Sequence, residues 1–212
     1  MSWLSFYRFY KKTNVKIKSS IRLRLLRSRA TFIGEGQSCS PEAVIALVGG
    51  SSKEDVIIHD HVDLYGKLAS YHHGKITMGS WSKIGPGTVI NCVNKIEIGK
   101  DTAIADNSLI IDNNTHPLCP ADRRYMRHTP HGSNERQPWH SANAPIIIGE
   151  NVWIGSNVRI CKGVTIGDNA IIAANSVLTK SVPANAVAAG NPAKIVKENI
   201  DQLTSPIFPL IK

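Results

Sequence analysis

The stretch IGENVWIGSNVRICKGVTIGDNAIIAANSVLTK, residues 148–180, repeats one pattern every six residues. A bulky aliphatic residue stands at each sixth position, and these residues are Ile148, Ile154, Ile160, Ile166, Ile172 and Leu178. An α-helix of 3.6 residues per turn would spread a six-residue period over its whole surface, and plain strand alternation would not single out one position in six. Short strands joined by tight corners, with the aliphatic side chain pointing inward, produce this period. The stretch therefore predicts a hexapeptide solenoid.

The same period continues upstream of this stretch, with weaker matches toward the N-terminus. The residues on it are Ile33, Cys39, Ile45, Ile58, Leu64, Met78, Ile84, Ile90, Ile98, Ile104 and Ile110. The longer steps from Leu64 to Met78 and from Ile90 to Ile98 indicate small insertions at corners of the solenoid. We therefore expect an all-β chain built almost entirely of this repeat.

One large interruption separates Ile110 from Ile148. It contains five prolines and four histidines and has no six-residue repeat. A long irregular segment that is anchored by a regular scaffold on both sides is usually functional. His116 stands six residues after Ile110, with Pro117 directly behind it. The sequence therefore predicts a histidine at a position that the scaffold would otherwise fill with isoleucine, where the chain turns outward.

Composition excludes several classes of protein. The chain of 212 residues is 42% hydrophobic, which predicts a folded domain with a sizeable core. Its longest apolar run, AVIALV at 43–48, is far shorter than the roughly 18–20 residues that span a bilayer. The N-terminus lacks the charge-then-apolar order of a secretory signal, and the four cysteines are widely spaced without a CxxC pair. We therefore expect a cytoplasmic protein.

Basic charge is concentrated in the first 34 residues, which contain nine Lys and Arg and no acidic residue. The rest of the chain has sixteen basic and sixteen acidic residues, so its charge gives no reason to expect nucleic acid. The basic segment also carries Trp3, Phe6, Tyr7 and Tyr10 on one face of a possible helix. Two interpretations stay open: contact with an anionic membrane surface through residues 1–30, or a helix that caps the exposed strand edge of the solenoid.

Residues 145–199 resemble the hexapeptide-repeat acyltransferases, in the branch of maltose, galactoside and polysaccharide O-acetyltransferases. The resemblance rests on VWIG at 152–155, GVTIGDNAIIAANSVLTK at 163–180 and AGNPAK at 189–194, and it is looser over 33–116. It implies a left-handed parallel β-helix with three hexapeptides per coil. It also implies a homotrimer that binds acetyl-CoA in grooves between neighbouring prisms, with a long loop beside each site.

The resemblance, together with the basic charge of the first residues, gives the chain its expected organisation and function. We expect a basic segment at 1–31, a β-helix at 32–190 with an excursion at 112–145, and a C-terminal tail at 191–212. The implied activity is transfer of acetyl from acetyl-CoA to a hydroxyl of a saccharide, in surface polysaccharide or lipopolysaccharide biosynthesis. The membrane interpretation of the basic segment would place this activity at the inner face of the membrane. The alternatives are an N-acetyltransferase that acts on an amino sugar and a non-catalytic β-helical scaffold.

The family places its catalytic histidine just after a coil, at the start of the long loop, and that position is His116 here. A sugar hydroxyl is a weak nucleophile that must lose its proton as it attacks a thioester. A neutral imidazole can accept that proton and then pass it to the CoA thiolate, without a covalent enzyme intermediate. Asp112, Asn113, Asn114 or a backbone carbonyl could orient the ring through its other nitrogen.

Further site residues carry over from the family position by position. The expected acetyl-CoA contacts are Trp153, Ser156, Ala174, Thr179, Lys180, Lys194 and Lys197. On the acceptor side, related enzymes use carboxylate or amide residues on the preceding coil, which here reads INCVNK at 90–95. Asn91 and Asn94, together with Asn114, are therefore the candidate saccharide contacts. Because this coil departs from the family pattern, we expect a different sugar acceptor.

Two rival chemistries can be weighed from the sequence. Cys119 lies three residues after His116, but this spacing on a proline-flanked loop gives no assurance of a Cys–His pair. The γ-class carbonic anhydrases share the implied fold and bind zinc through histidines, two of which are five residues apart. No two of the eight histidines have that spacing, so we expect no metal.

Overall fold

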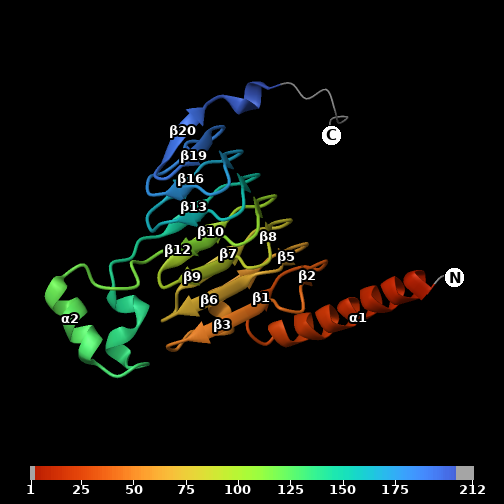
Figure 1. The fold of residues 1–212 in the computed structure, drawn as a ribbon, viewed down its shortest axis with the longest axis horizontal. Helices are drawn as coiled ribbons and strands as arrows, with labels where there is room; N and C mark the ends of the chain where they lie inside the picture. Colours follow the sequence, from red (N-terminus) through yellow and green to blue (C-terminus); the bar gives the residue numbers. More distant parts are fainter. Residues whose placement is uncertain (1–2, 204–212) are drawn as a thin grey trace.

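The computed structural model describes residues 3–203, with the backbone alone for residues 3–12. Three sheets of six, eight and six strands form the sides of a tapering prism (Figure 1), and all their strands are parallel except the last strand of the eight-stranded sheet, which pairs antiparallel with its neighbour. Each coil contributes one short strand to each sheet in turn, and every pairing among the coils is parallel. The predicted fold, a left-handed parallel β-helix, is confirmed.

The sheets are called A, B and C in the order in which a coil visits them. Sheet A consists of β1 (Thr31–Phe32), β4 (Val56–Ile58), β7 (Lys75–Met78), β10 (Lys95–Ile98), β13 (Ile146–Ile148) and β16 (Thr165–Ile166). Sheet B consists of β2 (Ser38–Cys39), β5 (Asp63–Leu64), β8 (Lys83–Ile84), β11 (Ala103–Ile104), β14 (Trp153–Ile154), β17 (Ile171–Ile172), β19 (Val187–Gly190) and β20 (Ala193–Lys197). Sheet C consists of β3 (Val44–Val48), β6 (Lys67–Tyr71), β9 (Val89–Cys92), β12 (Leu109–Ile111), β15 (Arg159–Ile160) and β18 (Val177–Leu178).

The residues on the six-residue period form the interior of the prism. All six aliphatic residues from Ile148 to Leu178 are at most 1% exposed. They stack on their counterparts one coil away, as Ile154 does on Ile104 and on Ile172. Each inward aliphatic side chain is thus removed from water by the coils above and below it, which is why the solenoid is stable only as a stack.

The first coils differ from the predicted register at two points. Ile33 is exposed, and Phe32 is the residue paired with Ile58. The long step from Leu64 to Met78 hides another inward residue, because Leu68 on β6 is fully buried between neighbouring coils. The interval therefore combines a tight corner before β6 with a longer one after it.

The corners require left-handed backbone conformations, and asparagine supplies many of them. Asn151, Asn169 and Asn185 follow one another along one corner, with φ between 52° and 59°. Asparagine tolerates this region better than other residues with a β-carbon. Their amides also hydrogen-bond along the stack, from Asn151 Nδ2 to Asn169 Oδ1 at 2.9 Å and from Asn169 Nδ2 to Asn185 Oδ1 at 2.8 Å.

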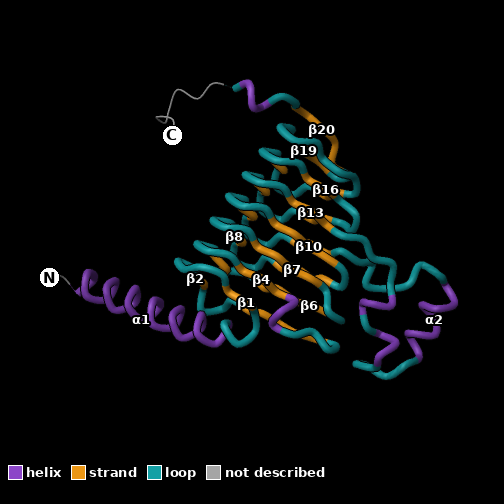
Figure 2. The backbone as a smooth tube through the Cα atoms, turned by 180° about the vertical axis from the view of Figure 1, so that it is seen from behind, coloured by secondary structure: helices purple, strands orange, loops and turns teal. Residues whose placement is uncertain are grey.

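Helix α1 (Trp3–Leu26) lies at the N-terminal end of the prism and runs outward from it (Figures 1 and 2). Its last turns pack on the first coil: Leu26 joins the core, and Arg22 Nε donates to Ala43 O at 2.5 Å. Ile17 and Ile21 are more than half exposed. The side chains of the aromatic residues predicted to line the first turns lie outside the described part of the chain.

The excursion leaves the prism after β12 and returns at β13, on the side away from α1 (Figure 1). It contains helix α2 (Pro120–His128) and the 3₁₀ turns η2 (Asn134–Arg136) and η3 (Pro138–His140). Two further 3₁₀ turns lie outside it, η1 (Lys53–Asp55) and η4 (Ile200–Gln202). Proline at the first position of α2 suits a helix start, since its missing N–H would have no intrahelical partner.

Candidate active site

The excursion begins and ends at a narrow neck that is built around Asp112. This carboxylate is fully buried and accepts backbone N–H groups from Val93 at 2.9 Å, Asn94 at 2.8 Å and Lys95 at 3.0 Å. The same aspartate receives the backbone N–H of Ala144 on its carbonyl oxygen at 2.9 Å. Asp112 therefore ties both limbs of the excursion to the corner between β9 and β10.

The two limbs also pair with each other directly beyond this anchor. Asn113 and Asn143 form an antiparallel bridge, and the N–H of Asn114 donates to Ala142 O at 3.0 Å. Asn94 Nδ2 donates to Asn143 Oδ1 at 2.9 Å, which joins the neck to the neighbouring corner. Asn94 and Asn114, both predicted to contact the saccharide, thus make contacts that hold the neck.

The ring of His116 has a defined partner in Thr115. His116 Nδ1 lies 3.0 Å from Thr115 Oγ1, and that hydroxyl lies 2.6 Å from Asn114 O. A hydroxyl has a single proton, and the carbonyl oxygen of Asn114 can only accept it. Thr115 therefore accepts from Nδ1–H of His116, which leaves a lone pair on Nε2. Sequence reasoning considered Asp112, Asn113 and Asn114 for this role and missed Thr115.

Asp112 influences this geometry through a chain of contacts and does not touch the ring. Asn113 Nδ2 donates to Asp112 Oδ1 at 3.1 Å, and the backbone N–H of Thr115 donates to Asn113 Oδ1 at 2.8 Å. Thr115 has φ of 61°, which is strained for a β-branched residue. The neck thus imposes on Thr115 the conformation that presents its hydroxyl to His116.

His116 does not occupy an inward position of the solenoid, contrary to the sequence-based prediction. Ile148 fills the position that follows Ile110, since it stacks on Ile98 in sheet A. His116 is exposed and lies just beyond the neck. It lines a hollow of about 310 Å³ together with residues of α2 and of the loop that follows, among them Arg127 and Arg136.

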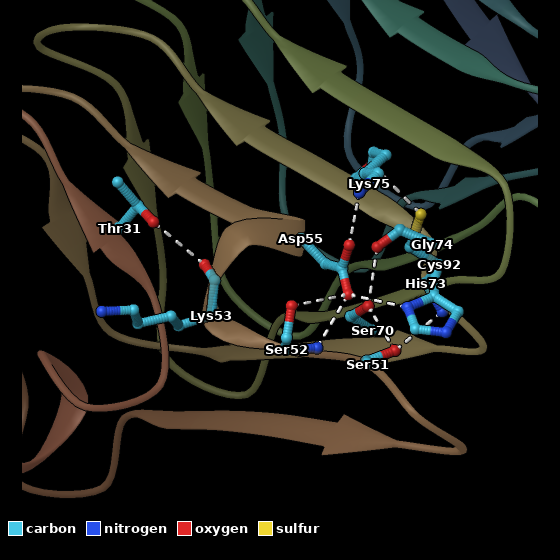
Figure 3. Close-up of polar contacts among 10 residues, drawn as sticks. All are labelled: Thr31, Ser51, Ser52, Lys53, Asp55, Ser70, His73, Gly74, Lys75 and Cys92. Carbon is cyan, nitrogen blue, oxygen red and sulfur yellow. Dashed lines mark hydrogen bonds and ion pairs between the residues drawn. The ribbon is translucent and has the colours of Figure 1, made fainter.

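The excursion folds back on the N-terminal coils through one aromatic contact. The ring of Trp139 stacks on His72 with a centroid distance of 5.2 Å and also covers Gly49. The next residue, His73, lies 3.4 Å from the buried carboxylate of Asp55, which Lys75 also contacts (Figure 3). Burial raises the pKa of the Asp55 carboxyl, but Lys75, the Ser52 backbone N–H and His73 outweigh it, so its pKa is lowered.

Asn91 offers an unused acceptor close to the neck. It lies on β9, where it pairs with Ile111 one coil away, immediately before the excursion begins. Its Oδ1 atom is buried and has no hydrogen-bond partner within residues 13–203. A buried carbonyl oxygen without a partner is costly and calls for a donor.

The predicted acetyl-CoA residues lie on two different edges of the prism. Trp153, which is 59% exposed, Lys194 and Lys197 lie on sheet B, and Ser156 and Ala174 lie at the corner that follows that sheet. Thr179 and Lys180 follow β18 of sheet C, two strands from β12 in the same sheet. That second edge is the one from which the excursion departs.

Cysteine and metal chemistry find no geometric support at this site. Cys119 precedes α2 as an exposed residue. Cys92 is fully buried, and burial together with the Asp112 charge raises the pKa of its thiol, which makes it a poor nucleophile. Across residues 13–203, no group of three or more His, Cys, Asp or Glu side chains is arranged to hold a metal ion.

Known proteins match both the repeat and the fold. The family model for bacterial hexapeptide transferases (six repeats) matches residues 145–180. The galactoside O-acetyltransferase of Escherichia coli (strain K12) is 35% identical over 132 residues, which are 59% of this chain and 65% of that enzyme.

Two solved structures share the fold at 24% sequence identity. The polySia specific acetyltransferase NeuO superposes with a TM-score of 0.58 over 85% of this chain and 91% of that one. The hexapeptide-repeat-containing acetyltransferase VCA0836 of Vibrio cholerae O1 biovar eltor, in complex with acetyl coenzyme A, gives a TM-score of 0.56 over 84% and 76%. The period of six, the three-sided prism and these relatives agree: the chain is an acetyltransferase whose repeat and fold are similar to those of the hexapeptide-repeat family.

Proposed function

We propose that this enzyme transfers acetyl from acetyl-CoA to a hydroxyl of a saccharide in surface polysaccharide or lipopolysaccharide biosynthesis, with His116 as general base. The observation that carries the proposal is the contact between His116 and Thr115. Because Nδ1–H donates to Thr115 Oγ1, Nε2 is left free to accept a proton. His116 also lines the hollow of the excursion, where an acceptor can enter.

The reaction needs one base and no covalent intermediate. Nε2 of His116 takes the proton of the acceptor hydroxyl as its oxygen attacks the thioester carbonyl carbon. The tetrahedral intermediate then collapses, the carbon–sulfur bond breaks, and the imidazolium returns its proton to the departing CoA thiolate. Asn91, on β9 directly before the excursion, is the proposed contact for another hydroxyl of the same sugar.

The distribution of the donor-site residues supports a homotrimer. His116, Thr179 and Lys180 lie on the edge from which the excursion leaves, whereas Trp153 and Lys194 lie on another sheet. An acetyl-CoA lying between two copies would contact the edge from which the excursion leaves in one copy and sheet B of its neighbour. Lys194 and Lys197 would then face the CoA phosphates, where a cation suits an anionic ligand.

The decisive experiment measures free-thiol release from acetyl-CoA across a panel of sugars. We expect His116→Ala to lower kcat by about 10²–10⁴-fold without changing the unfolding midpoint. His128→Ala is the matched control, because His128 is an exposed histidine of the same excursion that does not line the hollow, and it should keep full activity. Full activity of His116→Ala would overturn the proposal, and the absence of thiol release with every sugar of the panel would favour a non-catalytic scaffold.

The product distinguishes O-acetylation from the alternative, N-acetylation of an amino sugar. Hydroxylamine cleaves an acetyl ester and leaves an amide intact. We expect the acetylated product to lose its acetyl group under mild hydroxylamine treatment. A product that resists the treatment would assign the enzyme to the N-acetyltransferases, which the same base could serve.

We also propose that α1 contacts the anionic inner face of the membrane, as would suit a cytoplasmic enzyme that acts on lipid-linked glycans. Ile17, Ile21 and Leu25 are exposed at four-residue spacing, and the flanking charges are all basic. Within residues 3–203, no helix is long and apolar enough to cross a bilayer. Ile17→Glu with Ile21→Glu should abolish co-sedimentation with anionic vesicles, and unchanged sedimentation would rule this contact out.

A further inference from the structure

The hollow beside His116 is positively charged. Three arginines line it, Arg123 and Arg127 from α2 and Arg136 from η2, together with His131 of the connecting loop. No carboxylate is among its lining residues. A hollow of this sign attracts anionic groups, and a guanidinium can bind a carboxylate or phosphate through two parallel hydrogen bonds.

The acidic residues of the excursion are kept away from this hollow. Asp112 is buried in the neck, and Asp122 and Glu135 line a second hollow of about 290 Å³ that also contains Tyr125. Met126 borders both hollows. The excursion thus separates its charges into two compartments, and His116 lines only the cationic one.

Two of the three arginines are held in place by the excursion itself. Arg136 donates from Nε to Met126 O at 2.9 Å and from Nη2 to Arg127 O at 2.8 Å, and Nη1 lies 3.1 Å from His131 Nδ1. Arg123 Nη1 donates to the carbonyl oxygens of Pro117 and Leu118. Each guanidinium has five N–H groups, so both retain donors for a ligand. Fixed cations of this kind lose little conformational entropy when they bind an anion.

His131 adds a neutral donor to the same hollow. The guanidinium of Arg136 can only donate, so Nδ1 of His131 accepts from it and carries no proton. The ring proton of the neutral imidazole therefore lies on Nε2, which is free to donate to a ligand oxygen.

We propose that this hollow binds an anionic group of the acceptor, a carboxylate or a phosphate, beside the hydroxyl that His116 deprotonates. This rests on the proposed function and specifies its substrate as an acidic or phosphorylated saccharide. We expect the CoA phosphates to lie outside this hollow. When the thioester lies at His116, the pantetheine arm separates the phosphates from it, and other cations, Lys194 and Lys197, stand on β20 for them.

The test compares glucose derivatives that carry an anionic group with a neutral one. Methyl glucuronide is paired with methyl glucoside, and glucose 1-phosphate with methyl glucoside, in two measurements. One measurement uses saturation-transfer NMR to detect binding of the sugar to the enzyme in the absence of acetyl-CoA. The other is thiol release from acetyl-CoA at varied sugar concentration. We expect the charged sugars to bind more tightly, with kcat/KM at least about tenfold above that of the neutral one.

Two exposed arginines of α2 provide the variant and its control. Arg127 lines the hollow, whereas Arg124 lies on the same helix outside it. Arg127→Glu should remove the preference for charged sugars in both measurements and leave KM for acetyl-CoA unchanged. Arg124→Glu should keep the preference. A rise in KM for acetyl-CoA in Arg127→Glu would assign the hollow to the CoA phosphates instead and overturn the inference.

The binding measurement separates this inference from the proposed function. If charged sugars bind selectively but no sugar causes thiol release from acetyl-CoA, the acetyl transfer is refuted and the anion site is kept. Equal binding of charged and neutral sugars, or a preference that survives in Arg127→Glu, would refute the anion site even if acetyl transfer is observed.

Discussion

The solenoid and the excursion are stabilised in different ways. In the solenoid, each coil buries aliphatic side chains against its neighbours, and its strands hydrogen-bond to the coils on either side. Within the excursion, residues 112–145, Met126 is the single buried hydrophobic residue, and the other buried residues are the polar Asp112, Asn113 and Ser141. Stability is therefore concentrated in the repeat, whereas the segment that contains the proposed base is held at its neck and by the contact of Trp139 with His72.

The largest expected effect tests this division of stability. Ile154→Ala leaves a cavity in the stack and should lower the free energy of unfolding by about 3 kcal/mol. Met126→Ala removes a buried side chain of similar size from the excursion and should lower it by less than about 1 kcal/mol, because the excursion can loosen without unfolding the prism. Urea denaturation measures both. Equal losses would show that the excursion belongs to the cooperative core.

The second prediction concerns the neck. Asp112→Asn replaces acceptor lone pairs with an NH₂ group that faces backbone N–H donors, and it should cost about 2 kcal/mol in unfolding free energy. Asp168→Asn is the control in the solenoid, because Asp168 accepts one backbone N–H, from Glu150, and it should cost less than about 1 kcal/mol.

The same two variants also test whether the neck holds His116 in position, separately from its effect on stability. Asp112→Asn should also speed hydrogen exchange between residues 113 and 142 and lower kcat, since the contacts that lead to Thr115 and His116 begin at this carboxylate. Asp168→Asn should change neither. If Asp112→Asn keeps full kcat, the position of His116 does not depend on the neck.

The fold could be predicted because one rule governs it. An inward aliphatic residue every six positions is a direct record of coil geometry, so the register was right wherever corners have constant length. The predicted register was wrong at Ile33 and missed Leu68, because the early corners vary in length. Leu68 is an inward residue only four positions after Leu64. A fixed period cannot identify the inward residues of a coil whose corners differ in length from those of the other coils.

The site was predictable only in part. His116 stood out because it follows the last residue of the period, but its partner Thr115 gave no signal in the sequence. Nor did the role of Asp112, whose backbone partners lie about twenty residues earlier and are brought close by the stack. Helix α2 could have been expected from Pro120 and Asp122 at its start, which are typical of a first helical turn.

The third prediction concerns the surface on which the excursion rests. The pKa of Asp55 is lower in the folded chain than in the unfolded one, so its charge stabilises the fold above about pH 4 and this contribution is lost as the pH falls further. Asp55→Asn should therefore cost about 1–2 kcal/mol at pH 7 and progressively less below pH 4. Urea titrations at pH 7 and pH 3 measure the difference. A cost that does not depend on pH would show that the Asp55 charge is not what stabilises the cluster.

The smallest effect compares left-handed residues in the two regions. Asn169 at a solenoid corner and Thr115 beside His116 have nearly the same φ, 59° and 61°, but only asparagine is suited to it. Asn169→Thr should therefore cost about 1 kcal/mol of unfolding free energy, whereas Thr115→Gly should cost nothing or stabilise by up to about 1 kcal/mol.

Activity should move in the opposite direction from stability at Thr115. Thr115→Gly removes the hydroxyl that accepts from His116 Nδ1, so kcat should fall about tenfold, because nothing then holds the tautomer and orientation of the ring. Thr115→Ser restores the hydroxyl and should restore kcat. If glycine at this position raises stability and keeps kcat, the strained backbone of Thr115 has no role in presenting the base, and the contact between the two side chains is incidental.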